Sequence, residues 1–144
     1  MNLITSNAQT VTFEVAIPGI YRMDTIVNGT TFRRLFLPNG AAVNPEGSPE
    51  IPVLKYRVAV PKCEGINVSC NVISQQNMTP CLLYPVPHII FDSITGAQSE
   101  QFVFDSVAYA QPRLNESISI ITADGALREQ NYVEVMVKPV ENYW

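Results

Sequence analysis

The feature that most constrains this 144-residue chain is an alternation of apolar and polar residues with a period of two. The stretch KYRVAV (55–60) alternates Tyr56, Val58 and Val60 with polar or small residues, and YVEVMVKPV (132–140) alternates three valines in the same way. Similar runs occupy residues 11–17, 66–72, 101–109 and 117–121. Successive side chains of a strand point to opposite faces of a sheet, so the pattern predicts half-buried antiparallel strands. No segment carries a sustained helical stripe.

Short turn signals separate these runs, and each contains a glycine that tolerates a positive φ. They are Asn28-Gly29, Asn39-Gly40, Glu64-Gly65, Thr95-Gly96 and Asp124-Gly125. We therefore predict an all-β chain of about eight to ten strands, arranged as an antiparallel β-sandwich or jelly roll. We expect a hairpin to turn at Asp124-Gly125. The length suits a single domain over residues 1–144, with 1–9 as a loose N-terminal extension.

Prolines bracket one of the predicted strands. In EGSPEIPVLKYRVAVPKCEG (46–65), Pro49 and Pro52 precede the apolar run and Pro61 follows it. Proline has no N–H to donate to a ladder, so it is confined to strand starts, edges and ends. The sequence thus predicts an entry turn before a strand over 53–60, ended by Pro61, and a return into a strand over 66–73.

Composition excludes several classes of function. The net charge is -4 and 15% of the residues are charged, which is unlike a nucleic-acid-binding surface or a polybasic membrane patch. No apolar run approaches the roughly 20 residues of a membrane-spanning helix. The first residues, MNLITSNAQTVTF, lack the basic start and apolar block of a signal peptide, so we expect any export signal to lie outside this sequence.

The residues that carry most enzyme chemistry are scarce. His88 is the single histidine and lies between prolines and an apolar cluster, with no Gly-x-Ser-x-Gly motif anywhere in the chain. Cys63, Cys70 and Cys81 lack the spacing of a zinc site, and we expect Cys70 to be a buried residue on a strand face. A Cys63–Cys70 or a Cys70–Cys81 disulfide remains open. We predict no catalytic activity, no metal and no cofactor.

The segment CLLYPVPHIIFDSITGAQSEQ (81–101) is too long for a tight hairpin and too apolar for an ordinary surface loop. One interpretation is that Ile89, Ile90 and Phe91 fold back as a cap on the sheets. The other is that the segment is presented to a partner protein. The sequence leaves both open.

Two motifs give the chain a family resemblance. GSPEIPVLKYRVAVP resembles the Gly-x-Pro-x-Leu-Pro…Pro pattern of the propeptide that precedes gingipain-type, caspase-like secreted cysteine proteases. The end of the chain resembles the closing Leu-Arg…Pro-Val…Tyr element of that family. Ile51 stands in place of the usual Leu, and Glu129 in place of a Gly. The matching residues are Gly47, Pro49, Ile51, Pro52 and Pro61 in the first motif, and Leu127, Arg128, Pro139, Val140 and Tyr143 in the second.

The resemblance implies a non-catalytic β-sandwich that keeps a bacterial protease latent and assists its folding. Its partner would be the cognate cysteine protease catalytic domain, and its location secreted, periplasmic or cell-surface. Such propeptides insert a loop into the active-site cleft, where one side chain fills the specificity pocket. By order along the chain this loop is His88, Ile89, Ile90, Phe91, Asp92 and Ser93.

The loop departs from the best-known members, whose pocket residue is basic and whose proteases cut after Arg or Lys. Residues 86–100 contain no Lys or Arg, so the register places Asp92 or Phe91 at the pocket, with Arg113 as the fallback. Two other functions are compatible with the fold class. One is a β-sandwich binding or adhesion module for protein or carbohydrate, and the other is a structural subunit that adds strands to an assembly.

Overall fold

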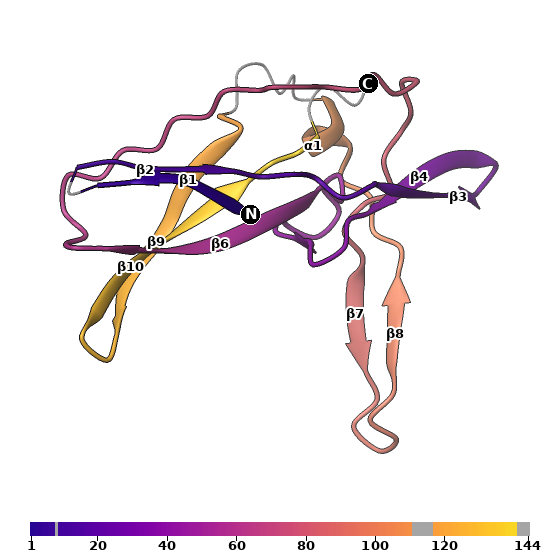
Figure 1. Cartoon of the computed structure of the whole chain (residues 1–144). Coiled ribbons are helices and arrows are strands. Elements are labelled where there is room, and N and C mark those ends of the chain that lie inside the picture. Colours follow the sequence, from indigo (N-terminus) through magenta and orange to yellow (C-terminus); the bar gives the residue numbers. More distant parts are fainter. Residues whose placement is uncertain (8, 111–116, 141–144) are drawn as a thin grey trace.

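A computed structural model describes residues 1–7, 9–110 and 117–140 of the chain (Figure 1). Within these ranges the chain forms ten strands and one short helix, which confirms the predicted all-β class. The elements are β1 (Asn2–Ser6), β2 (Val11–Glu14), β3 (Tyr21–Val27), β4 (Thr30–Phe36), β5 (Ala41–Ala42), β6 (Pro52–Val60), β7 (His88–Phe91), β8 (Gln98–Gln101), α1 (Ser106–Ala110), β9 (Ser119–Leu127) and β10 (Gln130–Val137).

The largest sheet has four antiparallel strands in the order β5-β6-β10-β9. Its central strands are the two with the clearest alternation in the sequence. Because β6 and β10 pair in register from Leu54↔Val137 to Val60↔Asn131, their apolar residues fall on a common face. The buried members of this first core cluster are Leu37, Leu54, Val60, Val133, Val135 and Val137.

Three two-stranded sheets complete the fold: β1-β2, β3-β4 and β7-β8. The β1-β2 hairpin packs on the four-stranded sheet, where the ring of Phe13 meets the ring of Tyr56 edge to face at 6.4 Å. The β3-β4 hairpin turns at Asn28-Gly29, with φ of 50° and 80°, as the sequence predicts. Within the segment expected as an N-terminal extension, Asn2–Ser6 pairs with β2, and its side chains are exposed.

The β9-β10 hairpin exists, but its turn is displaced from the predicted position. Strand β9 continues through Asp124-Gly125, and the chain reverses at Arg128, whose φ is +58°. Gly125 lies opposite Tyr132, and a Cβ at Gly125 would come within 2.9 Å of the Tyr132 hydroxyl oxygen. This glycine therefore makes room for a cross-strand ring instead of forming a turn.

Two other predicted strands are absent from the described residues. Residues 66–72 form no ladder; Ile66 and Val68 pack against the first core, whereas Cys70 is exposed. The run 101–109 is interrupted by α1, because the Asp105 carboxylate accepts the backbone N–H groups of Val107 and Ala108 as a helix N-cap. A period-two pattern thus reports alternating exposure, and it does not guarantee a partner strand.

A second core cluster joins segments that are distant in the sequence. Its buried members are Leu35, Ile51, Leu83 and Val140. Leu83 is completely buried, and Ile51 and Val140 come one from each of the two sequence motifs. This cluster lies where the chain enters the segment that leads to β7.

Candidate functional site

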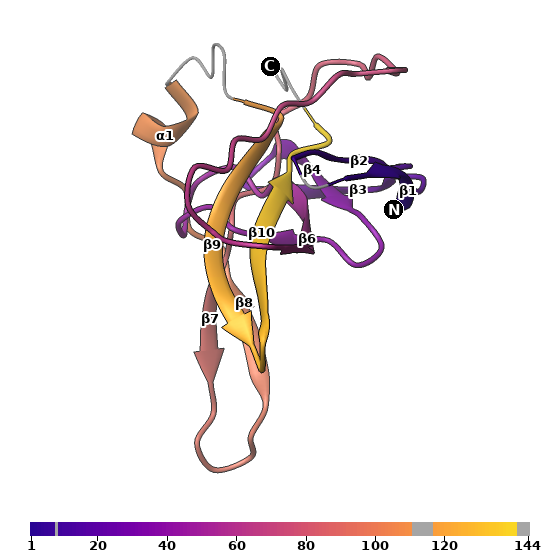
Figure 2. The same ribbon diagram turned by 60° about the vertical axis from the view of Figure 1, so that its left-hand side comes forward.

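The β7-β8 hairpin projects away from the rest of the molecule in both views (Figures 1 and 2). We call residues 88–101 the projecting hairpin. Its strands pair from His88↔Gln101 to Phe91↔Gln98, and every residue of both strands is exposed. The predicted irregular loop is therefore a regular hairpin. Phe91 is 66% exposed, so the apolar residues of β7 do not cap the sheets.

The tip of the projecting hairpin, residues 92–97, is a turn held by its own polar groups. The Asp92 carboxylate accepts the N–H groups of Ile94 at 2.8 Å and Thr95 at 3.2 Å. The Asp92 N–H donates to the Ala97 carbonyl, and the Gly96 N–H donates to the Asp92 carbonyl. The hydrogen bonds to the Asp92 carboxylate, that from the Ile94 N–H first and then those from Thr95, lower the pKa of Asp92 below its usual range. The tip is therefore ordered before any partner arrives.

The base of the projecting hairpin is held by a backbone clamp, which we define as residues 47–50 and 82–86. The Gly47 N–H donates to Val86, and the Glu50 N–H donates to Tyr84. On the other side, Tyr84 and Leu82 exchange hydrogen bonds with the backbone of Arg33 in β4.

The clustered prolines of the sequence belong to this clamp. Pro49 and Pro85 face each other in an isolated antiparallel bridge, and both are completely buried. The clamp is made by the N–H groups of neighbouring residues, so prolines without an N–H are compatible with it. Gly47, with φ +79°, allows the returning chain to approach, because an added Cβ would lie 3.2 Å from the Asp105 nitrogen.

Aromatic rings fill the base of the projecting hairpin. The Phe102 ring packs edge to face against the rings of Phe32 and Tyr84, with ring centroids 5.3 Å and 5.5 Å apart. The ring centroids of Phe104 and of Tyr109 in α1 are 4.4 Å apart, and the Tyr109 hydroxyl donates to the Leu83 carbonyl at 2.7 Å. Burial raises the pKa of Tyr109 above its usual range. Both ends of the projecting hairpin are thus fixed to the body by packing.

Arg34 links the body to strand β8. Its guanidinium donates to Glu50 at 2.5 Å and to Glu100 at 2.7 Å, and it lies over the ring of Tyr84 at 5.1 Å. The Arg34 side chain is only 16% exposed. The bonds from Arg34 lower the pKa of Glu100 below its usual range. We call Arg34 with its two carboxylate partners, Glu50 and Glu100, the Arg34 fork. Because a guanidinium binds a carboxylate with a defined direction as well as distance, the Arg34 fork holds β8 in a defined orientation to the body.

His88 does not belong to an arrangement suited to catalysis. Its Nδ1 lies 3.0 Å from both carboxylate oxygens of Glu46, in an exposed side-chain contact at the start of β7. Cys63, Cys70 and Cys81 are free, so neither disulfide left open by the sequence is formed. The Cys63 sulfur lies 3.6 Å from the Tyr132 carbonyl. Over residues 1–7, 9–110 and 117–140, no group of three or more potential metal ligands comes together.

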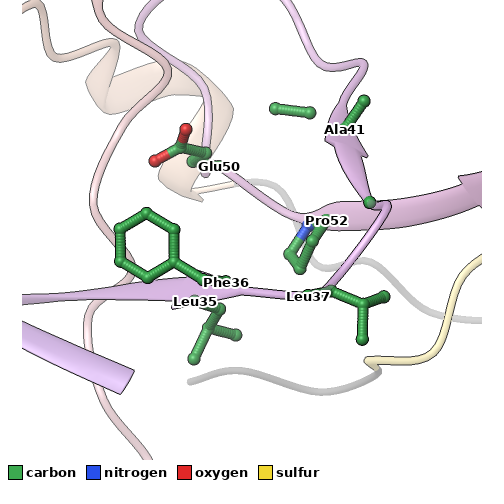
Figure 3. A pocket seen from close by; sticks show the side chains of 8 residues that line it. Leu35, Phe36, Leu37, Ala41, Glu50 and Pro52 are labelled. Atoms are coloured by element: carbon green, nitrogen blue, oxygen red, sulfur yellow. The ribbon is translucent and has the colours of Figure 1, made fainter. Parts of the chain in front are cut away.

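A small apolar hollow opens between β4 and the β5-β6 pair (Figure 3). Its volume is about 110 Å³, and its residues include Leu35, Phe36, Leu37, Ala41 and Pro52. Ligand pockets usually measure roughly 300–1,000 Å³. Glu50 reaches the hollow but is bound by Arg34, so the hollow offers little to a polar ligand. Among the described helices, none is long and apolar enough to cross a membrane.

The predicted site residues fall into separate regions. His88, Ile89, Ile90 and Phe91 form β7, while Asp92 and Ser93 begin the tip. Gly47 and Pro49 belong to the clamp, and Ile51 lies in the second core with Val140. The remaining motif residues serve other elements or lie outside the described residues: Pro52 begins β6, Pro61 follows it, Leu127 and Arg128 lie at the β9-β10 turn, Pro139 follows β10, and Tyr143 is outside, as is Arg113.

Sequence reasoning missed Ile94 and the Arg34 fork. Ile94 is 94% exposed at the centre of the tip. The sequence feature that could have identified Ile94 is an apolar residue within the polar run Asp-Ser-Ile-Thr-Gly, because turns are usually formed by polar residues and glycine. The Arg34–Glu100 pair joins residues 66 positions apart, and no local pattern in the sequence predicts such a contact.

The sequence model of the Propeptide_C25 family matches residues 1–144, the entire chain. The chain belongs to the Propeptide_C25 family. No curated protein matches it significantly. This family member has the fold of two solved Porphyromonas gingivalis structures, each only distantly similar in sequence.

One of these structures is a complex of the RgpB pro- and mature domains, with a TM-score of 0.73 and 14% identity. The match covers 96% of this chain and 72% of that one. The other describes the zymogenic latency of gingipain K, with a TM-score of 0.54 and 19% identity over 85% of this chain and 70% of that one. The fold of this Propeptide_C25 member is therefore shared with prodomains from gingipains.

Proposed function

We propose that this chain is a non-catalytic prodomain that keeps a secreted gingipain-type cysteine protease latent and assists its folding. Inhibition would follow from insertion of the projecting hairpin into the active-site cleft of the cognate protease. The observation that carries the proposal is the projecting hairpin itself, which has an exposed tip with Ile94 at its centre and a firmly held base, in a member of a propeptide family. A secreted, periplasmic or cell-surface location belongs to the same proposal.

The physical basis is preorganisation. A flexible loop loses conformational entropy when it docks, and this loss reduces its affinity. The projecting hairpin avoids much of this loss, because its tip bonds and its base are already formed in the free domain. The three residue intervals of β7 span on the order of 10 Å, so the tip can reach into a cleft while the body stays outside.

Two similar solved structures support the proposal by analogy. One is a complex of the RgpB pro- and mature domains, and the other concerns the zymogenic latency of gingipain K. A β-sandwich adhesion module is less well supported, because carbohydrate-binding sites commonly present aromatic platforms, and the aromatic cluster of this chain packs into the base of the projecting hairpin.

The test is a titration of the cognate protease domain, encoded in the same precursor, with the isolated chain. We expect stoichiometric loss of peptidase activity at submicromolar concentration. A variant in which residues 92–97 are replaced by Asn-Gly keeps the clamp and the base but shortens the tip. We expect it to fold, as judged by circular dichroism, and to inhibit at least 100-fold more weakly. Equal inhibition by the shortened variant would contradict insertion of the projecting hairpin.

A further inference from the structure

Ile94 is the most exposed large apolar side chain among the described residues, with 94% of its surface accessible to solvent. It lies at the centre of the tip, between Asp92 and Gly96. A fully exposed isoleucine contributes nothing to the stability of the free domain, whereas burial in a partner would stabilise a complex. This position is thus suited to a contact that forms only on binding.

The neighbouring candidate, Asp92, is committed to the turn. Its carboxylate already accepts the N–H groups of Ile94 and Thr95. To fill a pocket, Asp92 would have to release both bonds and unfold the tip. Phe91 precedes the tip in β7 and pairs with Gln98, so it lies on the flank of the projecting hairpin.

The charge of the projecting hairpin also favours Ile94 as the residue that enters the pocket. Residues 88–101 contain no Lys or Arg, and their carboxylates are Asp92 and Glu100. A pocket that selects Arg or Lys carries negative charge, which would find no cationic partner on this tip and would be repelled by Asp92. An apolar pocket would instead match the shape and chemistry of a branched aliphatic side chain.

We infer that Ile94 occupies the specificity pocket of the cognate protease, and that this pocket is apolar and selects a branched aliphatic residue before the scissile bond. This inference rests on the proposed function. Phe91 and Ile90 flank the tip and supply adjacent apolar contacts.

The closed shape of the tip explains why the projecting hairpin would inhibit the protease without being cleaved as a substrate. Peptides commonly bind to clefts in an extended form, through main-chain hydrogen bonds. Here the Asp92 N–H bonds to Ala97 and the Gly96 N–H bonds to Asp92, so the backbone around Ile94 is closed into a turn. Ile94 can therefore enter a pocket while its own peptide bonds are held out of the extended form that is cleaved.

The experiment has two parts. The cognate protease domain is first assayed with peptidyl-aminomethylcoumarin substrates that differ only in the residue before the scissile bond, which is Ile, Val, Leu, Phe, Asp, Lys or Arg. It is then titrated with the wild-type chain and with the variants Ile94→Leu, Ile94→Ala and Ile94→Asp. Ile26→Ala is the matched control, because Ile26 is an exposed isoleucine on β3, outside the projecting hairpin. Circular dichroism establishes that each variant is folded.

We expect the Ile and Val substrates to be cleaved fastest. Ile94→Ala should weaken inhibition roughly 10- to 100-fold, Ile94→Asp more, and Ile94→Leu only slightly, because burial of an aliphatic side chain drives the contact. If the wild-type chain inhibits but the protease prefers Asp, Lys or Arg, or if Ile94→Ala inhibits as well as wild type, the pocket assignment is wrong while the proposed function stands. If the wild-type chain does not inhibit, the proposed function is wrong and this inference falls with it.

Discussion

Pro49 and Pro85 face each other across an antiparallel bridge at the base of the projecting hairpin, with both rings completely buried. The bridge joins the first sequence motif to the segment that enters β7. Since neither residue offers an N–H, the pair contributes shape and rigidity, while Gly47 and Glu50 supply the hydrogen bonds. The buried Pro49–Pro85 pair therefore supports the base of the projecting hairpin.

Pro85→Ala should destabilise the protein by about 1–3 kcal/mol, because it leaves a space in a packed region and adds freedom to the unfolded chain. Pro18→Ala is the control, since Pro18 is exposed and should change the free energy of unfolding by less than about 0.5 kcal/mol. Urea unfolding followed by circular dichroism measures both. Similar midpoints for the two variants would show that the buried bridge is not a support.

Arg34→Met should loosen the projecting hairpin and destabilise the protein by about 1–3 kcal/mol, because Glu50 would lose its charged partner in a poorly exposed site. The matched variant Arg33→Met breaks an exposed pair with Asp24 and should have the smaller effect. Hydrogen exchange of the β7-β8 amides is the more specific measurement. Protection that falls equally in the two variants would contradict the role assigned to the Arg34 fork.

Gly125→Ala should destabilise the β9-β10 hairpin by about 1 kcal/mol, because the new Cβ would meet the ring of Tyr132. Gly19→Ala is the control, since a Cβ at Gly19 would meet no atom within 4 Å. Thermal unfolding compares the two variants. A Gly125→Ala protein as stable as Gly19→Ala would mean that Tyr132 moves aside at no cost.

The tip should open in acid. The pKa of Asp92 is lowered from its ordinary value of 3.8, so its ionised form is favoured in the folded tip. This stabilisation is complete well above pH 3.8, declines below it, and is lost as the pH falls through the lowered pKa of Asp92. The amide signals of Ile94 and Thr95 in NMR spectra should therefore titrate with a midpoint below 3.8, and Asp92→Asn should abolish the titration. A midpoint at or above 3.8 would contradict the bonds described for the tip.

Asp92→Ala should turn the projecting hairpin from an inhibitor into a substrate of the cognate protease, because the tip loses the acceptor that closes it. Mass spectrometry after incubation should show cleavage within residues 92–97, at least ten times faster than in wild type. Asp124→Ala, at an exposed aspartate of β9, is the matched control and should resist cleavage like wild type. Equal resistance of Asp92→Ala would imply that the turn is not what protects the tip.

The sequence predicted the elements whose pattern is set by burial. Strands β6 and β10 alternate because one face meets the core, and the prolines mark the ends of β6. The turn at Asp124-Gly125 was placed wrongly, because the glycine there serves Tyr132 across the hairpin. Helix α1 was missed because five residues are too few to show a helical stripe, although Asp105 is a capping signal.

The candidate site was only partly predictable, because its conformation depends on more than local sequence. The composition of residues 81–101 marked this segment as unusual, and the family resemblance placed the expected inhibitory loop within it. Its conformation depends on contacts between distant residues, such as Arg34 with Glu100 and Pro49 with Pro85, and these leave no periodic trace in the sequence. The role of Asp92 in the turn, and hence the prominence of Ile94, required the geometry of the tip.

The most direct test of the central claim is a competition for the active-site cleft. The affinity of the chain is measured by calorimetry for the free cognate protease and for the same protease whose catalytic cysteine has been alkylated by a peptidyl chloromethylketone that fills the specificity pocket. Insertion of the projecting hairpin predicts that the blocked protease binds at least 100-fold more weakly. Equal affinity for the free and blocked protease would place the prodomain outside the cleft and contradict the account.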